Sequence, residues 1–253
     1  MTLILLLLAA AAGGAANALA GGGTFIVFPA LLLAGVASVK ANATSSLIML
    51  PGGIASAWVY RRSLAGQHNM TIGQMVGISI AGSLVGSLLL LRTPNGTFSN
   101  LVPWLLLVAA AVFTAAPRLR SAAAHAHGHR SSLLLFAGQF VIAVYGGYFG
   151  AGMGVLMIAL FLAAANMGVQ EASGLRMLCA TAVNILAVVL FAARGALDWK
   201  FGLPMFVASI VGGYLGATVF TRLSDKMARN AILVYAWALT VWFFARTLMS
   251  HTS

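Results

Sequence analysis

The chain has 253 residues, of which 61% are hydrophobic and only 7% are charged, and its mean hydropathy is +1.00. Too few polar side chains are present to cover a water-facing surface, so the composition excludes an ordinary soluble domain and indicates a multi-pass membrane protein. The 14 Lys and Arg residues against 3 Asp and Glu sit singly or in pairs between apolar runs, as loop charges do. No nucleic-acid partner is therefore expected, and an interior almost free of acid favours anions over cations.

The first segment, Met1 to Ala20, is similar to a secretory signal peptide because a leucine run is followed by small residues. No Lys or Arg precedes the leucines, so we expect the segment to be retained. The apolar stretch from Leu3 to Ala34 is longer than one span of about 20 residues and shorter than two spans with a turn. The glycines at 21–23 therefore mark either a tight turn between a long and a short helix or an unwound segment inside the membrane.

Both arrangements expose backbone amides around Gly22 and Gly23, and Thr24 adds a hydroxyl where the next helix would begin. An anion site at a helix N-terminus is one interpretation of this pattern. Close packing of helices through small residues, which is common in membrane bundles, is the other.

A small polar cluster follows Lys40 and contains Asn42, Thr44, Ser45 and Ser46. These side chains can bind a substrate, or they can cap the helix that runs to Tyr60. Pro51, Gly52 and Gly53 are predicted to interrupt that helix in mid-membrane, which is tolerated where a helix lines a polar cavity. The basic pair Arg61 and Arg62 is the predicted cytoplasmic anchor.

Two further apolar runs cover Thr71 to Leu91 and Phe98 to Ala116. The first carries Gly82 and Gly86, and the same G-x-x-x-G spacing returns at Gly212 and Gly216, which predicts close helix packing. A polar segment at 118–131 then separates a first half, 1–117, from a second half, 132–253. It contains the histidines His125, His127 and His129, which suit either a solvated loop or a transition-metal site. We expect the loop, with no metal and no cofactor.

The second half repeats the plan with changes. Its glycines are spaced as Gly150, Gly152 and Gly154, and Arg176 lies inside an apolar run that also carries Thr181 and Asn184. An arginine within the membrane is costly and by default indicates a functional site. The alternative is that it reaches back to the interface near Glu171. Cys179, the single cysteine, is expected to be an inert buried thiol, and without a histidine in its segment no enzyme activity is expected.

A constant offset relates the two halves. Gly152 minus Gly22 is 130, and the same difference separates Val169 from Val39, Gly212 from Gly82, Gly216 from Gly86, Arg222 from Arg92 and Asn230 from Asn100. This register predicts an internal duplication. The expected fold is an all-α membrane protein with two repeats of four to five hydrophobic segments each. An odd number of crossings per repeat makes them inverted, which we expect, and an even number makes them parallel. Broken or short helices at the repeat interface are typical of a transporter site.

Several motifs follow one another in a distinctive order: the glycine-rich turn with F-x-x-x-P-x-L-L-L, then N-A-T-S-S-L and Y-R-R, then F-G-A-G-M-G and R-G-A-L-D-W. In this order the chain resembles the sulfite exporter TauE/SafE family of membrane permeases. The resemblance implies transport of sulfite, mostly outward, or of organosulfonates across the bacterial inner membrane by alternating access. The second half departs from the pattern, with Ala172, Ser173 and Gly174 in place of an A-T-S cluster.

The expected partners are a small anionic substrate and membrane lipid, with a homo-oligomer as a further option. A small dianion needs hydrogen-bond donors and a cation without a competing carboxylate. The candidate substrate-binding residues are Gly22, Gly23, Thr24, Asn42, Thr44, Ser45, Ser46, Gly150, Gly152, Gly154, Arg176, Thr181 and Asn184. A permease for a carboxylate or for a divalent metal ion is the alternative, although the apolar runs lack the His, Asp or Glu ligands that a metal would need.

Overall fold

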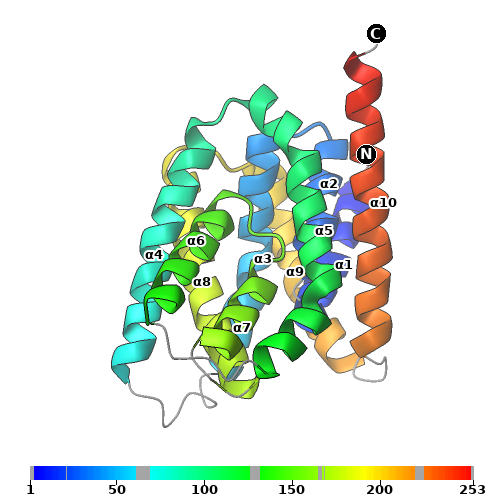
Figure 1. Cartoon of the computed structure of the whole chain (residues 1–253). Coiled ribbons are helices and arrows are strands. Elements are labelled where there is room, and N and C mark those ends of the chain that lie inside the picture. Colours follow the sequence, from blue (N-terminus) through cyan, green and yellow to red (C-terminus); the bar gives the residue numbers. More distant parts are fainter. Residues whose placement is uncertain are drawn as a thin grey trace.

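The computed structural model describes residues 3–20, 22–60, 69–125, 132–164, 167, 169–219 and 225–251. Within these ranges every regular element is an α-helix, as the composition predicts (Figure 1). The helices are α1 (Leu3–Ala20), α2 (Thr24–Leu33), α3 (Ser38–Tyr60), α4 (Asn69–Arg92), α5 (Asn95–His125), α6 (Ser132–Tyr148), α7 (Met153–Ala164), α8 (Val169–Ala193), α9 (Trp199–Val219) and α10 (Asp225–His251).

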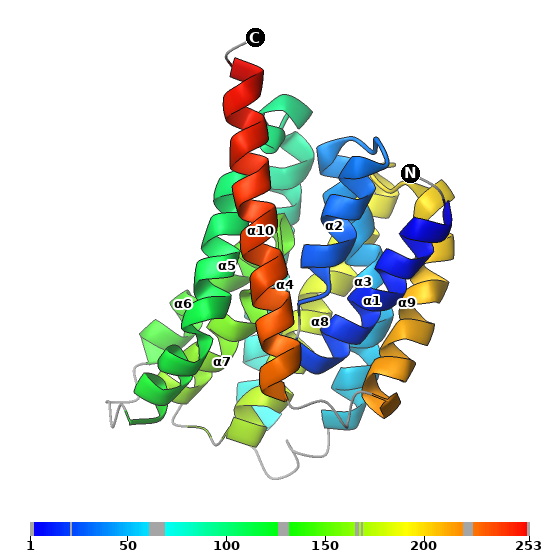
Figure 2. The same cartoon turned by 90° about the vertical axis from the view of Figure 1, so that its right-hand side faces the viewer.

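Two helices are too short to cross a membrane. α2 has 10 residues and α7 has 12, so at 1.5 Å per residue they measure about 15 and about 18 Å, roughly half of a hydrocarbon core of about 30 Å. Each follows a glycine-containing turn and packs against the helix before it, α1 or α6. Both glycine turns lie at intermediate height in the bundle, while the α2–α3 turn and the end of α7 lie at opposite ends of the molecule (Figure 1 and Figure 2). The tight turn, rather than a long unwound segment, is therefore the arrangement of both pairs.

α3 and α8 pack against each other at the centre of the bundle, and each also contacts α4 or α9. Near its start α3 reaches the turn after α8, where the Asp198 amide donates to Thr44 Oγ1 at 2.9 Å. Further along α3, the Gly53 carbonyl accepts from Thr181 Oγ1 at 3.0 Å, in the middle of α8. Because residue numbers rise along α3 as they fall along α8, the two helices are antiparallel.

Glycines allow the closest helix contacts. A Cβ at Gly212 would overlap the backbone of Ala11 where α9 packs on α1, and a Cβ at Gly86 would overlap the Val144 carbonyl where α4 packs on α6. At Gly82 the added atom would lie 2.6 Å from the Phe140 carbonyl oxygen. The predicted packing role is confirmed for these three glycines, and the surroundings of Gly216 fall outside the described residues.

The prediction that α3 is interrupted at Pro51 is wrong, because the helix runs without a break from Ser38 to Tyr60. A proline removes one backbone N–H and so one intrahelical hydrogen bond. Neighbouring helices donate to carbonyls on either side of it: Ser209 Oγ to Ile48 O at 2.6 Å and Thr181 Oγ1 to Gly53 O. These bonds support the helix through the proline.

The capping interpretation of Asn42, Thr44 and Ser45 is also wrong, because α3 already begins at Ser38. The residue that caps it comes from another helix: Asn95 Oδ1 accepts from the Val39 amide at 3.2 Å. Helix α5 in turn continues to His125, and so extends into the polar segment predicted at 118–131. His127, His129, Arg61 and Arg62 lie outside the described residues.

Three helices of the described part are long and apolar enough to cross a membrane, namely Ile72–Arg92, Asn95–Ala115 and Glu171–Ala193. Large apolar side chains such as Ile80, Val189 and Val207 are exposed on the outside of the bundle, as expected for a surface that faces lipid. The described helices thus form one bundle around the α3–α8 contact, with the two glycine turns inside it.

Two glycines on α4 test the packing. Gly86→Ala should lower the free energy of unfolding by about 1–3 kcal/mol, because the added methyl meets backbone that cannot move aside. Gly77→Ala is the matched control, since nothing lies within 4 Å of a Cβ there, and it should be neutral or gain up to about 1 kcal/mol of helix propensity. Thermal unfolding of the detergent-solubilised variants checks this, and equal melting temperatures would contradict the packing argument.

Candidate functional site

The break between α6 and α7 is shaped by two glycines in the left-handed region, Gly150 with φ +81° and Gly152 with φ +79°. Side chains other than glycine are strained there. The Tyr145 carbonyl ends α6 by accepting from the amides of Phe149 (2.9 Å) and Gly150 (3.2 Å). The Tyr145 hydroxyl then donates to the Ala151 carbonyl at 2.6 Å. The turn is therefore held in one conformation, and α7 starts at a defined place inside the bundle.

The Arg176 side chain lies against this start of α7. A Cβ added to Gly154 would be 2.6 Å from Arg176 Nη1 and 3.6 Å from Cζ, so the guanidinium occupies the space that glycine leaves beside the first turn of α7. Its Nη2 also lies 3.3 Å from Met177 Sδ. The N-terminal end of a helix carries partial positive charge and open amides. The guanidinium and these amides are both donors that can bind one anion from two directions.

The position of Arg176 bears on its two interpretations. α8 starts at Val169, so the Arg176 Cα lies seven residues, or about 10 Å, into the helix. Its guanidinium contacts the beginning of α7. Because α7 is about 18 Å long, its beginning lies that far from its outer end. The guanidinium therefore lies beside the inner end of α7.

The turn between α1 and α2 is built differently. Gly22 O accepts from the Phe25 amide at 3.2 Å, and Gly23 O accepts from Ile26 and Val27, so α2 begins at Thr24, where the sequence predicts a helix start. A Cβ at Gly23 would overlap the Gly13 carbonyl and Met49 Sδ. Close packing therefore accounts for Gly23, whereas Thr24 is half-buried at the start of the helix.

Asn17 also lies at this turn. It is not among the site residues predicted from the sequence. Its Nδ2 lies 3.2 Å from where a Gly52 Cβ would be, and its Cβ lies 2.9 Å from the corresponding point on Gly23. A half-buried amide thus stands where α1, α2 and α3 meet. The available signal was a lone polar residue in an apolar run, four residues before the triple glycine.

Thr181 connects the two turns. It lies five residues, or about 7–8 Å, beyond Arg176 on α8, and its hydroxyl donates to the Gly53 carbonyl, next to the glycine that contacts Asn17. Asn184 follows one helical turn later on the same face and is half-buried. The candidate site therefore extends from the start of α7 across the α3–α8 contact to the start of α2.

The polar cluster of α3 is tied into the protein. Thr44 Oγ1 accepts from the Asp198 amide, and the hydroxyls of Ser45 and Ser46 donate to the Asn42 carbonyl at 2.8 and 3.3 Å. The Asn42 amide nitrogen donates to the Tyr148 carbonyl at the end of α6 (2.9 Å). Thr44 and Ser45 are fully buried, and their bonds give them a structural role, so we leave these two out of the candidate site.

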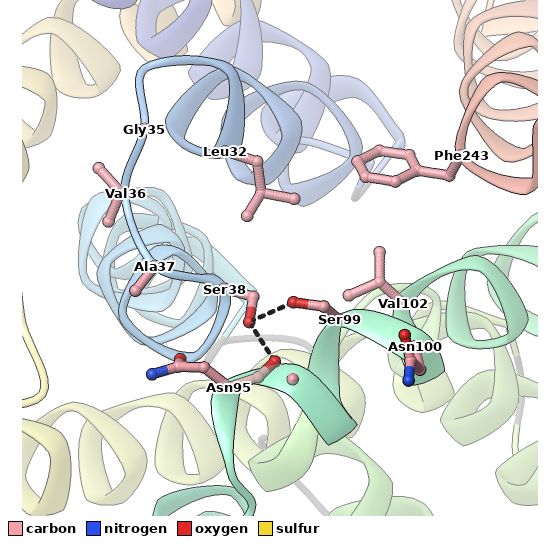
Figure 3. A pocket seen from close by; sticks show the side chains of 11 residues that line it. Leu32, Gly35, Val36, Ala37, Ser38, Asn95, Ser99, Asn100, Val102 and Phe243 are labelled. Atoms are coloured by element: carbon pink, nitrogen blue, oxygen red, sulfur yellow. Dashed lines mark hydrogen bonds between the residues drawn. The ribbon is translucent and has the colours of Figure 1, made fainter. Parts of the chain in front are cut away.

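A pocket of about 460 Å³ lies elsewhere, between the α2–α3 turn, the start of α5 and Phe243 of α10 (Figure 3). Its lining contains none of the predicted substrate residues. Ser38 Oγ donates to the Asn95 carbonyl and Ser99 Oγ donates to Ser38 Oγ, both at 3.0 Å. These polar groups hold the beginnings of α3 and α5 together, so we interpret the pocket lining as structural.

Comparison with known proteins identifies the family. The family model described as "Sulfite exporter TauE/SafE" matches residues 5–243. The chain belongs to this family. It is 26% identical over 222 residues to a "Probable membrane transporter protein" of Haemophilus influenzae, covering 87% of this chain and 85% of the relative. It is 28% identical to "Probable membrane transporter protein ORF9" of a Sinorhizobium species (88% and 85% covered) and 25% identical to "Probable membrane transporter protein YfcA" of Escherichia coli K12 (84% and 78%). The protein is thus a membrane transporter.

Gly154→Ala tests the contact between Arg176 and α7. The methyl should push the guanidinium away from the start of α7 while the fold persists, because a flexible side-chain end can give way. Losing one charge-assisted hydrogen bond costs about 1.5–3 kcal/mol, so sulfite should bind about tenfold more weakly or worse. Isothermal titration of purified protein measures this, with Gly73→Ala as the control because a Cβ there meets open space. Unchanged affinity in Gly154→Ala would contradict the assignment.

Proposed function

We propose that this transporter is a permease for small sulfur-containing anions, which exports sulfite or transports organosulfonates across the bacterial inner membrane by alternating access. The observation that carries the proposal is the Arg176 guanidinium beside Gly154 at the start of α7. A guanidinium offers a planar pair of donors to two oxygens of one oxyanion. The first amides of α7 offer further donors from another direction, which suits a group with three oxygens such as sulfite or a sulfonate.

A carboxylate anion could use the same arginine, but it has only two oxygens to share between the guanidinium and the helix start. A divalent metal ion fits less well. In the described part of the chain no three His, Cys, Asp or Glu side chains lie close enough together to hold a metal. The positive charge of Arg176 would also repel such an ion. We therefore rank sulfur oxyanions first, carboxylates second and metal ions third.

We further infer that the fold is an inverted duplication. The helices of 3–125 and 132–251 match in order, and their first residues differ by 129 to 131; Trp199 minus Asn69 and Asp225 minus Asn95, for example, are both 130. α3 and α8 are equivalent under this offset and run antiparallel. Equivalent helices of opposite direction are what an inverted repeat requires, and five helices per half agree with it.

The contact between Thr181 and Gly53 supports a symmetry axis at the candidate site. Under the offset of 130, Pro51 is equivalent to Thr181 and Gly53 is equivalent to Val183. The symmetry counterpart of the Thr181–Gly53 contact is therefore the pair Pro51 and Val183, which lies directly beside it. The two halves then meet at mid-membrane, next to both glycine turns. Motion of one half relative to the other would expose such a site to each side of the membrane in turn.

The driving force for export needs no intramembrane carboxylate. An inside-negative potential contributes about 2.3 kcal/mol per charge per 100 mV, so a dianion that leaves the cell moves down the electrical gradient. Accordingly, we expect sulfite efflux from proteoliposomes to be accelerated by an imposed potential that is negative on the sulfite-loaded side.

The decisive substitutions are at Arg176. Arg176→Lys keeps the charge but loses the planar fork, and it should weaken sulfite binding moderately. Arg176→Ala loses both and should nearly abolish binding and flux with folding intact. Labelled sulfite and organosulfonate flux in proteoliposomes is the measurement. If Arg176→Ala instead lowers thermal stability while the surviving protein binds sulfite normally, the arginine is an interfacial anchor and the proposed site fails.

The histidine segment provides a separate test of the metal alternative. Replacing His125, His127 and His129 with alanine should leave anion flux unchanged, because in the sequence they belong to the polar segment that follows the apolar part of α5. A large loss of flux in this variant, together with restoration by added metal in the wild type only, would instead favour a metal-dependent transporter.

A further inference from the structure

Asn42 carries a buried polar atom that has no hydrogen-bond partner among the described residues. Asn42 is 1% exposed, and its Nδ2 donates to the Tyr148 carbonyl. Its Oδ1 is also buried, and no donor in the described part of the chain reaches it. A buried acceptor without a partner costs about 1–3 kcal/mol, so it requires an explanation.

The atom lies at the end of α6, because Oδ1 and Nδ2 belong to the same planar carboxamide. α6 ends inside the bundle, and the C-terminal end of a helix carries partial negative charge. The Gly147 and Tyr148 carbonyls accept from Ser87 Oγ and Asn42 Nδ2 respectively, whereas the Tyr145 carbonyl already accepts from two amides. The Gly147 and Tyr148 oxygens each have a second lone pair. The end of α6 therefore presents acceptors and negative potential beside an amide oxygen without a donor.

Oxygen ligands of this kind suit an alkali cation. The ends of broken helices and amide oxygens can coordinate sodium in transporters, and neutral ligands offset a single positive charge more readily than a double one. We propose that Asn42 Oδ1, beside the negative end of α6, is a ligand of one bound monovalent cation, with sodium as the test ion. The α6–α7 break then binds two ions of opposite sign: a cation at the end of α6 and the anion at the start of α7. This site goes beyond the proposed anion transport.

The second half provides a natural comparison. The residue at the position of Asn42 is Ala172, which is fully buried in α8. An alanine is thus accommodated at the equivalent place in this protein, and only the first half carries the amide. The variant Asn42→Ala is expected to fold for the same reason.

Sodium binding can be measured without any sulfur anion, so failure of the proposed function and failure of this site remain distinguishable. The purified protein is unfolded by heat in rising sodium chloride, with choline chloride keeping the ionic strength constant, because choline is a bulky organic cation rather than a small alkali ion. We expect a saturable rise in melting temperature for the wild type and no rise for Asn42→Ala. Gln139→Ala is the control: Gln139 is equally buried in α6 and its Oε1 also lacks a donor among the described residues. It should lower stability but keep the sodium effect.

Binding of radioactive sodium to the wild type gives a readout that does not depend on any variant. One saturable site per chain, lost in Asn42→Ala and kept in Gln139→Ala, supports the proposal. No saturable sodium binding by the wild type overturns it and leaves a water molecule as the partner of Asn42 Oδ1. Equal sodium effects in the wild type and Asn42→Ala, or loss of the effect in Gln139→Ala, overturn it as well.

Discussion

Two helices of this protein, α1 and α6, end inside the bundle, where the backbone groups that a helix end leaves open need partners from the protein itself. Much of the interior responds to this constraint. The Tyr145 hydroxyl and Asn42 Nδ2 donate to the Ala151 and Tyr148 carbonyls, Arg176 lies beside the start of α7, and Gly13 and Met49 pack closely on the start of α2. The same helix ends create local charge of both signs, which gives the apolar bundle a place to hold an ion.

Under the proposed duplication the two helix breaks occupy equivalent positions, but they differ in backbone conformation and in chemistry. The position of Arg176 in the second half is Ser46 in the first, and the position of Asn42 in the first half is Ala172 in the second. The arginine is therefore present in the second half only, and the asparagine in the first half only. In our proposal, an inverted pair of halves alternates between two arrangements of similar energy, and an arginine present in one half only gives the substrate one defined site between them. In our account, the repeat provides the motion and its departures from symmetry provide the specificity.

Local patterns predicted the parts of the structure that depend on nearby residues. The start of α2 at Thr24, the packing glycines of α4 and the position of Arg176 inside an apolar helix all follow from spacing and polarity. The intact α3 did not follow, because Pro51 is supported by bonds from Thr181 and Ser209, which are more than 120 residues away in sequence. From the sequence alone Thr44 is a candidate substrate ligand, whereas in the structure its hydroxyl accepts a hydrogen bond from the Asp198 amide. Asn17 could have been found, since it is a lone amide in an apolar run, but its meaning depends on the contact with Gly52.

The most direct test of the central claim is to locate the anion itself. Selenite has the shape and charge of sulfite, and selenium scatters X-rays anomalously, so crystals grown with selenite would show its position without ambiguity. We expect an anomalous peak within hydrogen-bonding reach of the Arg176 guanidinium and the first amides of α7. A peak confined to the pocket at Ser38 and Asn95, or elsewhere away from Arg176, would contradict the account.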